Sequence, residues 1–106
     1  AIQEVHMATI RIDYERVMHQ AEEVDEQAGR LGQAIQELDS LVEQIRAAWE
    51  SPARREFLGQ CQVLREEMRS NQLAMLSVAS DVRGTAKRIR DEDLRSAEMA
   101  AQLKRK

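Results

Sequence analysis

The 106-residue chain has few of the residue types that build disulfide scaffolds, compact mixed folds or membrane spans. It contains one cysteine, one proline, four glycines and three aromatic residues. A single cysteine, Cys61, excludes an intramolecular disulfide. No stretch approaches the roughly 18 consecutive apolar residues of a membrane-spanning helix. We therefore expect a single domain that does not insert into membranes and that, if it leaves the cell, does so without a cleaved leader.

Patterns that support catalysis or metal binding are also missing. No glycine-rich phosphate loop follows a strand, and neither a nucleophile elbow nor a Cys–His pair can be built. His19 lies near Glu15, Glu22 and Glu23, but a carboxylate-bundle metal site needs Glu-x-x-His repeated on inward helix faces. We predict no enzymatic activity, no metal and no cofactor.

The chain does contain two series of mostly apolar or small residues at alternating steps of four and three. The first series is Ile10, Tyr14, Val17, Ala21, Val24, Ala28, Leu31, Ile35, Leu38, Val42, Ile45 and Trp49. The second series is Phe57, Cys61, Leu64, Met68, Asn71, Met75, Val78, Val82, Thr85 and Ile89. This 3.5-residue period is typical of helices that pack lengthwise against other long helices.

The only proline, Pro52, separates the two series. Proline disfavours helical geometry in the preceding residue and suits the first position of a helix, so Ser51 is the expected N-cap. We predict a helix over about 9–49, a turn at 50–52, a second helix over about 53–93, and a tail from about 94 to 106, helical or not. Residues 1–6 lack the heptad pattern, and His6-Met7 suggests a cloning remnant, so the single domain is assigned to 7–106.

Two helices with matching seams and a tight turn form an antiparallel hairpin. Apolar residues beside the seams, such as Leu41 and Leu73, widen the stripe beyond what one partner helix covers. We therefore predict an all-α hairpin that dimerises into a four-helix bundle. Asn71 interrupts the second seam, where one polar residue can fix register and partner number. Alternatively, the helix bends or exposes its seam at Asn71.

Trp49 at the central turn, followed by Ala53 and Phe57 in a helical hairpin of this length, resembles the WXG family of early-secreted-antigen-like proteins. These are small substrates of type VII (ESX) secretion systems. The turn in that family reads Trp-x-Gly, and Ser51 stands here in place of the glycine. The resemblance spans almost the whole chain and implies that Trp49, Ser51, Ala53 and Phe57 form the secretion-motif turn.

The resemblance also implies a C-terminal export signal of the form Tyr-x-x-x-Asp/Glu. Its best equivalent is Ile89 with Asp93, so the acid matches and the tyrosine does not. This departure implies either a weaker apolar contact at Ile89 or a partner that supplies the complete signal. The chain is also similar to small helical accessory proteins that bind the N-terminal helices of LXG toxins.

The resemblance therefore implies a protein exported by a type VII system, or a co-exported partner or chaperone, with a cytoplasmic pool before export. The implied partners are a second copy, another WXG- or LXG-type helical protein, and the secretion ATPase. One alternative is an intracellular coiled-coil adaptor with no export role. Another is a dimeric helical-hairpin RNA binder that uses Arg83, Lys87, Arg88 and Arg90, although a net charge of −3 disfavours nucleic acid.

Overall fold

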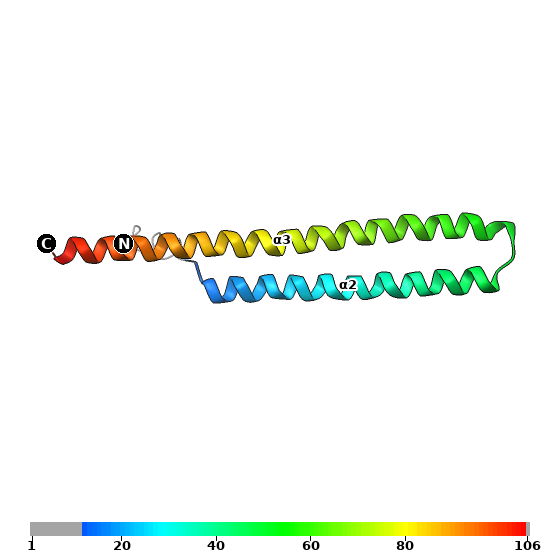
Figure 1. Cartoon of the computed structure of the whole chain (residues 1–106), viewed down its shortest axis with the longest axis horizontal. Helices are drawn as coiled ribbons and strands as arrows, with labels where there is room; N and C mark the ends of the chain where they lie inside the picture. Colours follow the sequence, from blue (N-terminus) through cyan, green and yellow to red (C-terminus); the bar gives the residue numbers. More distant parts are fainter. Residues whose placement is uncertain (1–11, 106) are drawn as a thin grey trace, which may run out of the picture. The chain divides into compact units, whose positions relative to one another are not determined.

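The computed structural model describes residues 12–105, which form two long helices and no strand. Helix α2 spans Tyr14–Ala48 and helix α3 spans Pro52–Arg105 (Figure 1). The fold class is therefore all-α, as predicted. The helices contribute to two compact units. We call Glu23–Ser77 the turn unit, and the described residues up to Glu22 with those from Val78 the end unit.

The N-terminus of α2 is capped by Asp13. The Asp13 Oδ1 atom accepts a hydrogen bond from the Arg16 backbone N–H at 3.2 Å, and its carbonyl accepts one from the Val17 N–H at 3.1 Å. A carboxylate cap satisfies a free N–H group and interacts favourably with the helix dipole. This cap explains why α2 begins at Tyr14 rather than near the predicted residue 9, although residues 1–11 lie outside the described part of the chain.

The turn between the helices has the predicted serine cap followed by a proline at the first position of the second helix. Helix α2 ends at Ala48, and Ser51 Oγ accepts a hydrogen bond from the Ala53 N–H at 3.1 Å. The Ser51 carbonyl accepts a second bond from the Arg54 N–H at 3.0 Å. Ser51 is thus the N-cap of α3 and Pro52 its first helical residue.

Helix α3 continues to Arg105, beyond the end predicted near residue 93. No proline or glycine follows Asp93, and the sequence from Leu94 to Lys104 is rich in alanine, leucine, glutamate, lysine and arginine. These residues have high helix propensity. The predicted tail is therefore helical over residues 94–105.

The inward side of α2 follows the predicted first seam. In the turn unit, Ala28 and Ile35 are buried, and the other seam residues of α2 are half-buried. The half-buried seam positions of α2 in both units are Tyr14, Val17, Val24, Leu31, Leu38, Val42 and Ile45. Trp49 lies beyond the end of α2 and is exposed.

The inward side of α3 differs from the predicted second seam at alternate positions. Cys61 is buried, and Met68, Met75, Val82 and Ile89 are half-buried, as a seam requires. The exposed positions of the predicted seam are Phe57, Leu64, Asn71, Val78 and Thr85. The next residue along takes the inward place in each case: Leu58, Arg65, Gln72, Ala79 and Ala86. This inward series also has steps of four and three, so it is a second heptad phase on the same helix.

The end unit has a core of small side chains. Ala21, Ala79 and Ala86 are all almost completely inaccessible to solvent. Alanine at buried positions allows close packing with no loss of side-chain entropy. The Arg90 guanidinium lies 4.3 Å from the centre of the Tyr14 ring, a cation–π contact at the start of α2.

Candidate protein interaction surfaces

The turn carries an exposed aromatic pair. The ring centres of Trp49 and Phe57 lie 5.5 Å apart, with ring planes inclined by 52°. Trp49 is 37% exposed and Phe57 39% exposed, so each ring packs on the other and still presents an open edge. Exposed aromatic side chains held in place are typical of protein interaction sites.

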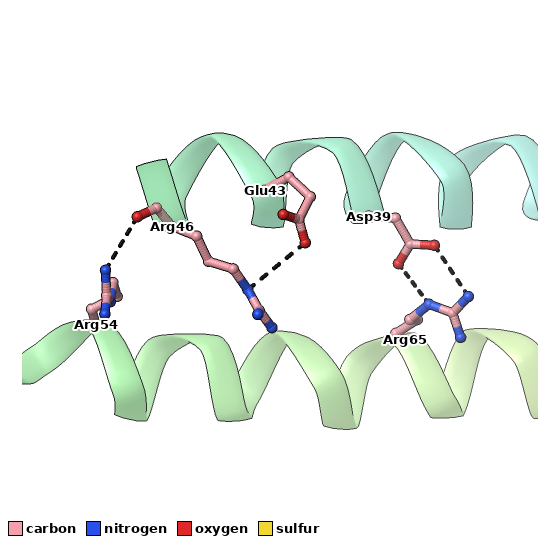
Figure 2. Close-up of polar contacts among 5 residues, drawn as sticks. All are labelled: Asp39, Glu43, Arg46, Arg54 and Arg65. Atoms are coloured by element: carbon pink, nitrogen blue, oxygen red, sulfur yellow. Dashed lines mark hydrogen bonds and ion pairs between the residues drawn. The ribbon is translucent and has the colours of Figure 1, made fainter. Parts of the chain in front are cut away.

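Arg54 closes this turn. Its Nη1 atom donates hydrogen bonds to the Arg46 carbonyl at 3.1 Å and to the Trp49 carbonyl at 3.2 Å. The last carbonyls of a helix lack intrahelical partners, and a guanidinium can satisfy them. Figure 2 shows Arg54 reaching from α3 to the C-terminal end of α2. The backbone that carries Trp49 is therefore fixed by α3 itself.

An ion pair between Asp39 and Arg65 joins the two helices in the turn unit. Arg65 donates from Nε to Asp39 Oδ1 at 2.6 Å and from Nη2 to Asp39 Oδ2 at 3.1 Å (Figure 2). The hydrogen bonds from Arg65, with its positive charge, hold the pKa of Asp39 below its usual value. Two parallel bonds between rigid planar groups fix the register of the helices more than they add to stability at an exposed site.

A second polar contact supports the same register. The Gln72 side-chain Nε2 donates to the Ala28 carbonyl at 3.1 Å. Gly32 leaves the space for this side chain, because a Cβ atom added at Gly32 would lie 2.5 Å from Gln72 Nε2. Gly29 has no atom within 4 Å of an added Cβ. Only one of the two glycines in the middle of α2 is thus used in packing within the chain.

We expect alanine to act differently at these two glycines. Gly29→Ala should raise the free energy of unfolding by up to about 1 kcal/mol, because alanine has the higher helix propensity and meets no neighbour. Gly32→Ala should raise the free energy of unfolding less or not at all, because Gln72 must move and lose its hydrogen bond to the Ala28 carbonyl. Thermal unfolding followed by circular dichroism compares the two. An equal gain at both positions would show that the Gln72 contact contributes nothing.

A pH dependence follows from the lowered pKa of Asp39. The stability that Asp39 contributes is complete above its ordinary pKa of 3.8 and is lost as pH falls through the lower value of the folded state. Below about pH 4, the free energy of unfolding of the original chain should fall as Asp39 becomes protonated. Asp39→Asn has no carboxyl group at this position, so its free energy of unfolding should fall less over the same pH range. Urea unfolding at a series of pH values between about 2 and 6 measures this. Identical pH profiles for the two chains would contradict it.

The contacts of Arg54, Arg65 and Gln72 do not follow from the apolar pattern of the sequence. Arg65 and Gln72 occupy inward positions that the apolar pattern assigned to Leu64 and Asn71. The sequence pattern that identifies Arg65 and Gln72 as inward residues is a second series with steps of four and three, which begins at Leu58.

The two sides of the turn unit differ in charge. One side has a shallow groove between the helices. Its lining is Leu38, Asp39, Val42, Glu43, Arg46, Leu58, Cys61, Gln62, Arg65 and Glu66. We call this the charged side, and an ion pair between Glu43 and Arg46 at 3.8 Å also lies on it (Figure 2).

The opposite side of the same unit has no charged residue in the rows next to the seams. Residues seven apart share a row along a helix in a heptad arrangement. Asp39 and Gln62 each directly follow a seam residue, and both line the groove. Each heptad has a second seam position, and the residue directly before it lies on the opposite side of the seam. These are Gln27, Ala34, Leu41 and Ala48 on α2, and Phe57, Leu64 and Asn71 on α3. We call these seven residues the uncharged face.

The signal candidates Ile89 and Asp93 lie in the end unit on α3. Both are half-buried, and they are one helical turn apart on the same row as the inward series. Among the described residues, no group of His, Cys, Asp and Glu could hold a metal ion. No helix in residues 12–105 is long and apolar enough to cross a membrane.

A comparison with protein-family models matches residues 9–94 to the family described as proteins of 100 residues with WXG. The chain belongs to the WXG family. This confirms the resemblance carried by Trp49, Ala53 and Phe57 and makes the chain a small helical protein associated with type VII secretion. No curated protein and no solved structure matches it. The matched range includes the aromatic turn of this WXG protein and both signal candidates, Ile89 and Asp93.

Proposed function

We propose that the protein is exported by a type VII secretion system, or acts as the co-exported partner or chaperone of another substrate, and that it works by packing into a helical bundle. The family match over residues 9–94 carries this proposal. It implies a cytoplasmic pool before export and a secreted pool without cleavage of a signal peptide. Its partners are a second copy or another WXG- or LXG-type helical protein, and the secretion ATPase.

Exposed apolar side chains support the bundle. Among the described residues, the large apolar side chains that remain exposed are Leu41, Trp49, Phe57, Val63, Leu64, Leu73, Leu76, Val78, Leu94, Met99 and Leu103. Of these, Leu41, Phe57 and Leu64 lie on the uncharged face, and an amphipathic helix gains most of its stability by burying its apolar face. Contiguous exposed apolar surface commonly marks a protein interaction site. A second helical protein packed against the hairpin would bury these apolar side chains.

The aromatic turn supports recognition by the secretion machinery. Trp49 and Phe57 are held by a capped and arginine-closed turn, and they remain open to solvent. We propose that this turn and the pair Ile89 and Asp93 are read by the secretion ATPase. The missing tyrosine means that Ile89 either makes a weaker contact or is complemented by the partner's own signal.

The test is the amount of this protein in culture medium from its native host, compared between strains with and without the type VII secretion ATPase. A cytosolic marker protein controls for lysis. Loss of the extracellular pool on deletion supports the proposal. If the protein stays inside the cells of both strains while its expression is confirmed, the intracellular adaptor is the better assignment.

A further inference from the structure

Helix α3 carries two heptad series in the turn unit, and one set of inward residues is common to both. The shared inward residues are Cys61, Met68 and Met75. The observed inward series adds Leu58, Arg65 and Gln72. The other series adds Phe57, Leu64 and Asn71, which face outward. Neighbouring residues lie about 100° apart around a helix, so a rotation of α3 by about 50° about its own axis would exchange the two series.

The observed inward series is the more polar of the two. It brings Arg65 and Gln72 toward α2, while Phe57 is 39% exposed and Leu64 47% exposed. Burial of apolar surface alone would favour the opposite rotation of α3. Polar contacts with α2 must therefore hold the helix in its observed rotation.

Two side-chain contacts hold this rotation. Asp39 accepts two hydrogen bonds from Arg65 (Figure 2). The Ala28 carbonyl accepts one from the Gln72 amide. The side chains of Arg65 and Asp39 are 38% and 45% exposed, and ion pairs at such exposed sites add little net stability. The observed rotation is therefore favoured by a small margin.

We propose that α3 is a two-position rotational switch in the turn unit, and that the ion pair between Asp39 and Arg65 selects the position in which Phe57 is exposed. Without the ion pair, α3 turns so that Phe57 and Leu64 face α2 and the Arg65 guanidinium is hydrated. Gln72 and Asn71 carry the same amide group, so each position presents one amide toward α2.

The switch controls the aromatic turn. Phe57 belongs to the series that is outward in the observed position, and its ring centre lies 5.5 Å from that of Trp49. Inward rotation withdraws Phe57 from the surface and changes this ring pair. The consequence for secretion rests on the proposed reading of the turn by the secretion ATPase, whereas the rotation itself does not.

Alkylation of single cysteines by iodoacetamide tests the rotation in the purified full chain. Cys61→Ala removes the native thiol, and Leu58→Cys and Asn71→Cys then report on the inward and outward series. Asp39→Ala should raise the alkylation rate of the Leu58→Cys chain at least about threefold and lower that of the Asn71→Cys chain, because thiol reactivity depends on exposure. All chains are compared at one protein concentration, and circular dichroism verifies that each is helical.

Arg65→Leu is the matched control. It abolishes the same ion pair, but it makes the observed inward series more apolar and so favours the observed rotation. Both alkylation rates should therefore stay close to those of the chain with the ion pair. Arg65→Leu should also reverse the effect of Asp39→Ala when the two substitutions are combined.

Three results would overturn the inference. A rise of both alkylation rates in the Asp39→Ala chain would indicate local opening of the hairpin and not rotation. Unchanged rates would show that the ion pair does not select the rotation. An equal response to Arg65→Leu would show that the choice of heptad series plays no part. If Asp39→Ala does not fold, Asp39→Asn, which keeps the size of the side chain, replaces it in the same comparison.

Export in the native host tests the control of the aromatic turn separately. Asp39→Ala should lower the ratio of extracellular to intracellular protein, and Arg65→Leu should not. If the original chain is itself retained in the cell, the proposed function fails while the alkylation rates still decide the rotation. Rotation of the Asp39→Ala chain with unchanged export would overturn the control of the turn.

Discussion

Replacement of Ile35 by alanine is expected to lower the free energy of unfolding by about 2–5 kcal/mol, which is the usual cost of truncating a buried isoleucine. Ile35 is only 2% exposed and is the largest fully buried side chain among the described residues. Much of the remaining core consists of alanines and half-buried residues, which cannot fill the resulting cavity. Since small domains are stable by only about 5–15 kcal/mol, this is a large share of the total.

Urea unfolding followed by helical circular dichroism measures this loss. Protein concentration must be fixed, because association makes apparent stability depend on concentration. Leu73→Ala is a matched control, since Leu73 is 56% exposed and lies outside the uncharged face. Alanine has a higher helix propensity than isoleucine, so a large loss at position 35 reports packing. Equal losses at Ile35 and Leu73 would show that the buried seam is not the main source of stability.

The first seam was predictable because one heptad phase on α2 dominates. Its inward positions are apolar or small throughout, as at Ala28 and Ile35, and Asp39 and Arg46 flank them on the charged side. Helix α3 carries two phases that share Cys61, Met68 and Met75. Apolar content alone selects Leu64 over Arg65, but the structure places Arg65 inward because Asp39 supplies its hydrogen-bond acceptors. Which of the two heptad phases faces inward therefore depends on the neighbouring helix and cannot be predicted from the spacing of apolar residues in α3 alone.

The turn was predictable because Pro52 and Ser51 act locally. Proline sets the first turn of a helix, and a serine before it satisfies a free N–H group, whatever lies elsewhere in the chain. The closure by Arg54 was not predictable, because it depends on where the last carbonyls of α2 come to lie. The prediction left open whether the tail from about residue 94 is helical, and α3 continues through it to Arg105.

The candidate site was predictable to different extents in the two units. Trp49 and Phe57 were recognised by their spacing around the turn, but their exposed ring pair follows from the three-dimensional packing. The secretion roles proposed for Ile89 and Asp93 rest on the family pattern alone. Within this chain, both residues occupy the inward row of α3. A receptor can therefore contact only the parts of these two side chains that remain accessible to solvent.

Asp93→Ala is expected to abolish most of the export while leaving the chain folded. Asp93 supplies the one side chain that matches the acidic position of the family's signal, and no described core contact depends on its carboxylate. The measurement is the ratio of extracellular to intracellular protein in a strain with an active secretion ATPase. Glu92→Ala removes the same charge from the exposed preceding residue and should be exported normally.

The companion substitution tests the same signal in the opposite direction. Ile89→Tyr restores the tyrosine of the family pattern four residues before Asp93 and should raise export if Ile89 is a weak substitute. If Ile89→Tyr leaves export unchanged while Asp93→Ala abolishes it, the acid acts without an aromatic partner in its own chain, and the partner supplies the complete signal. Normal export of a folded Asp93→Ala protein would instead remove the assignment, because the half-buried carboxylate would then have no role in recognition and Ile89 would be an ordinary seam residue.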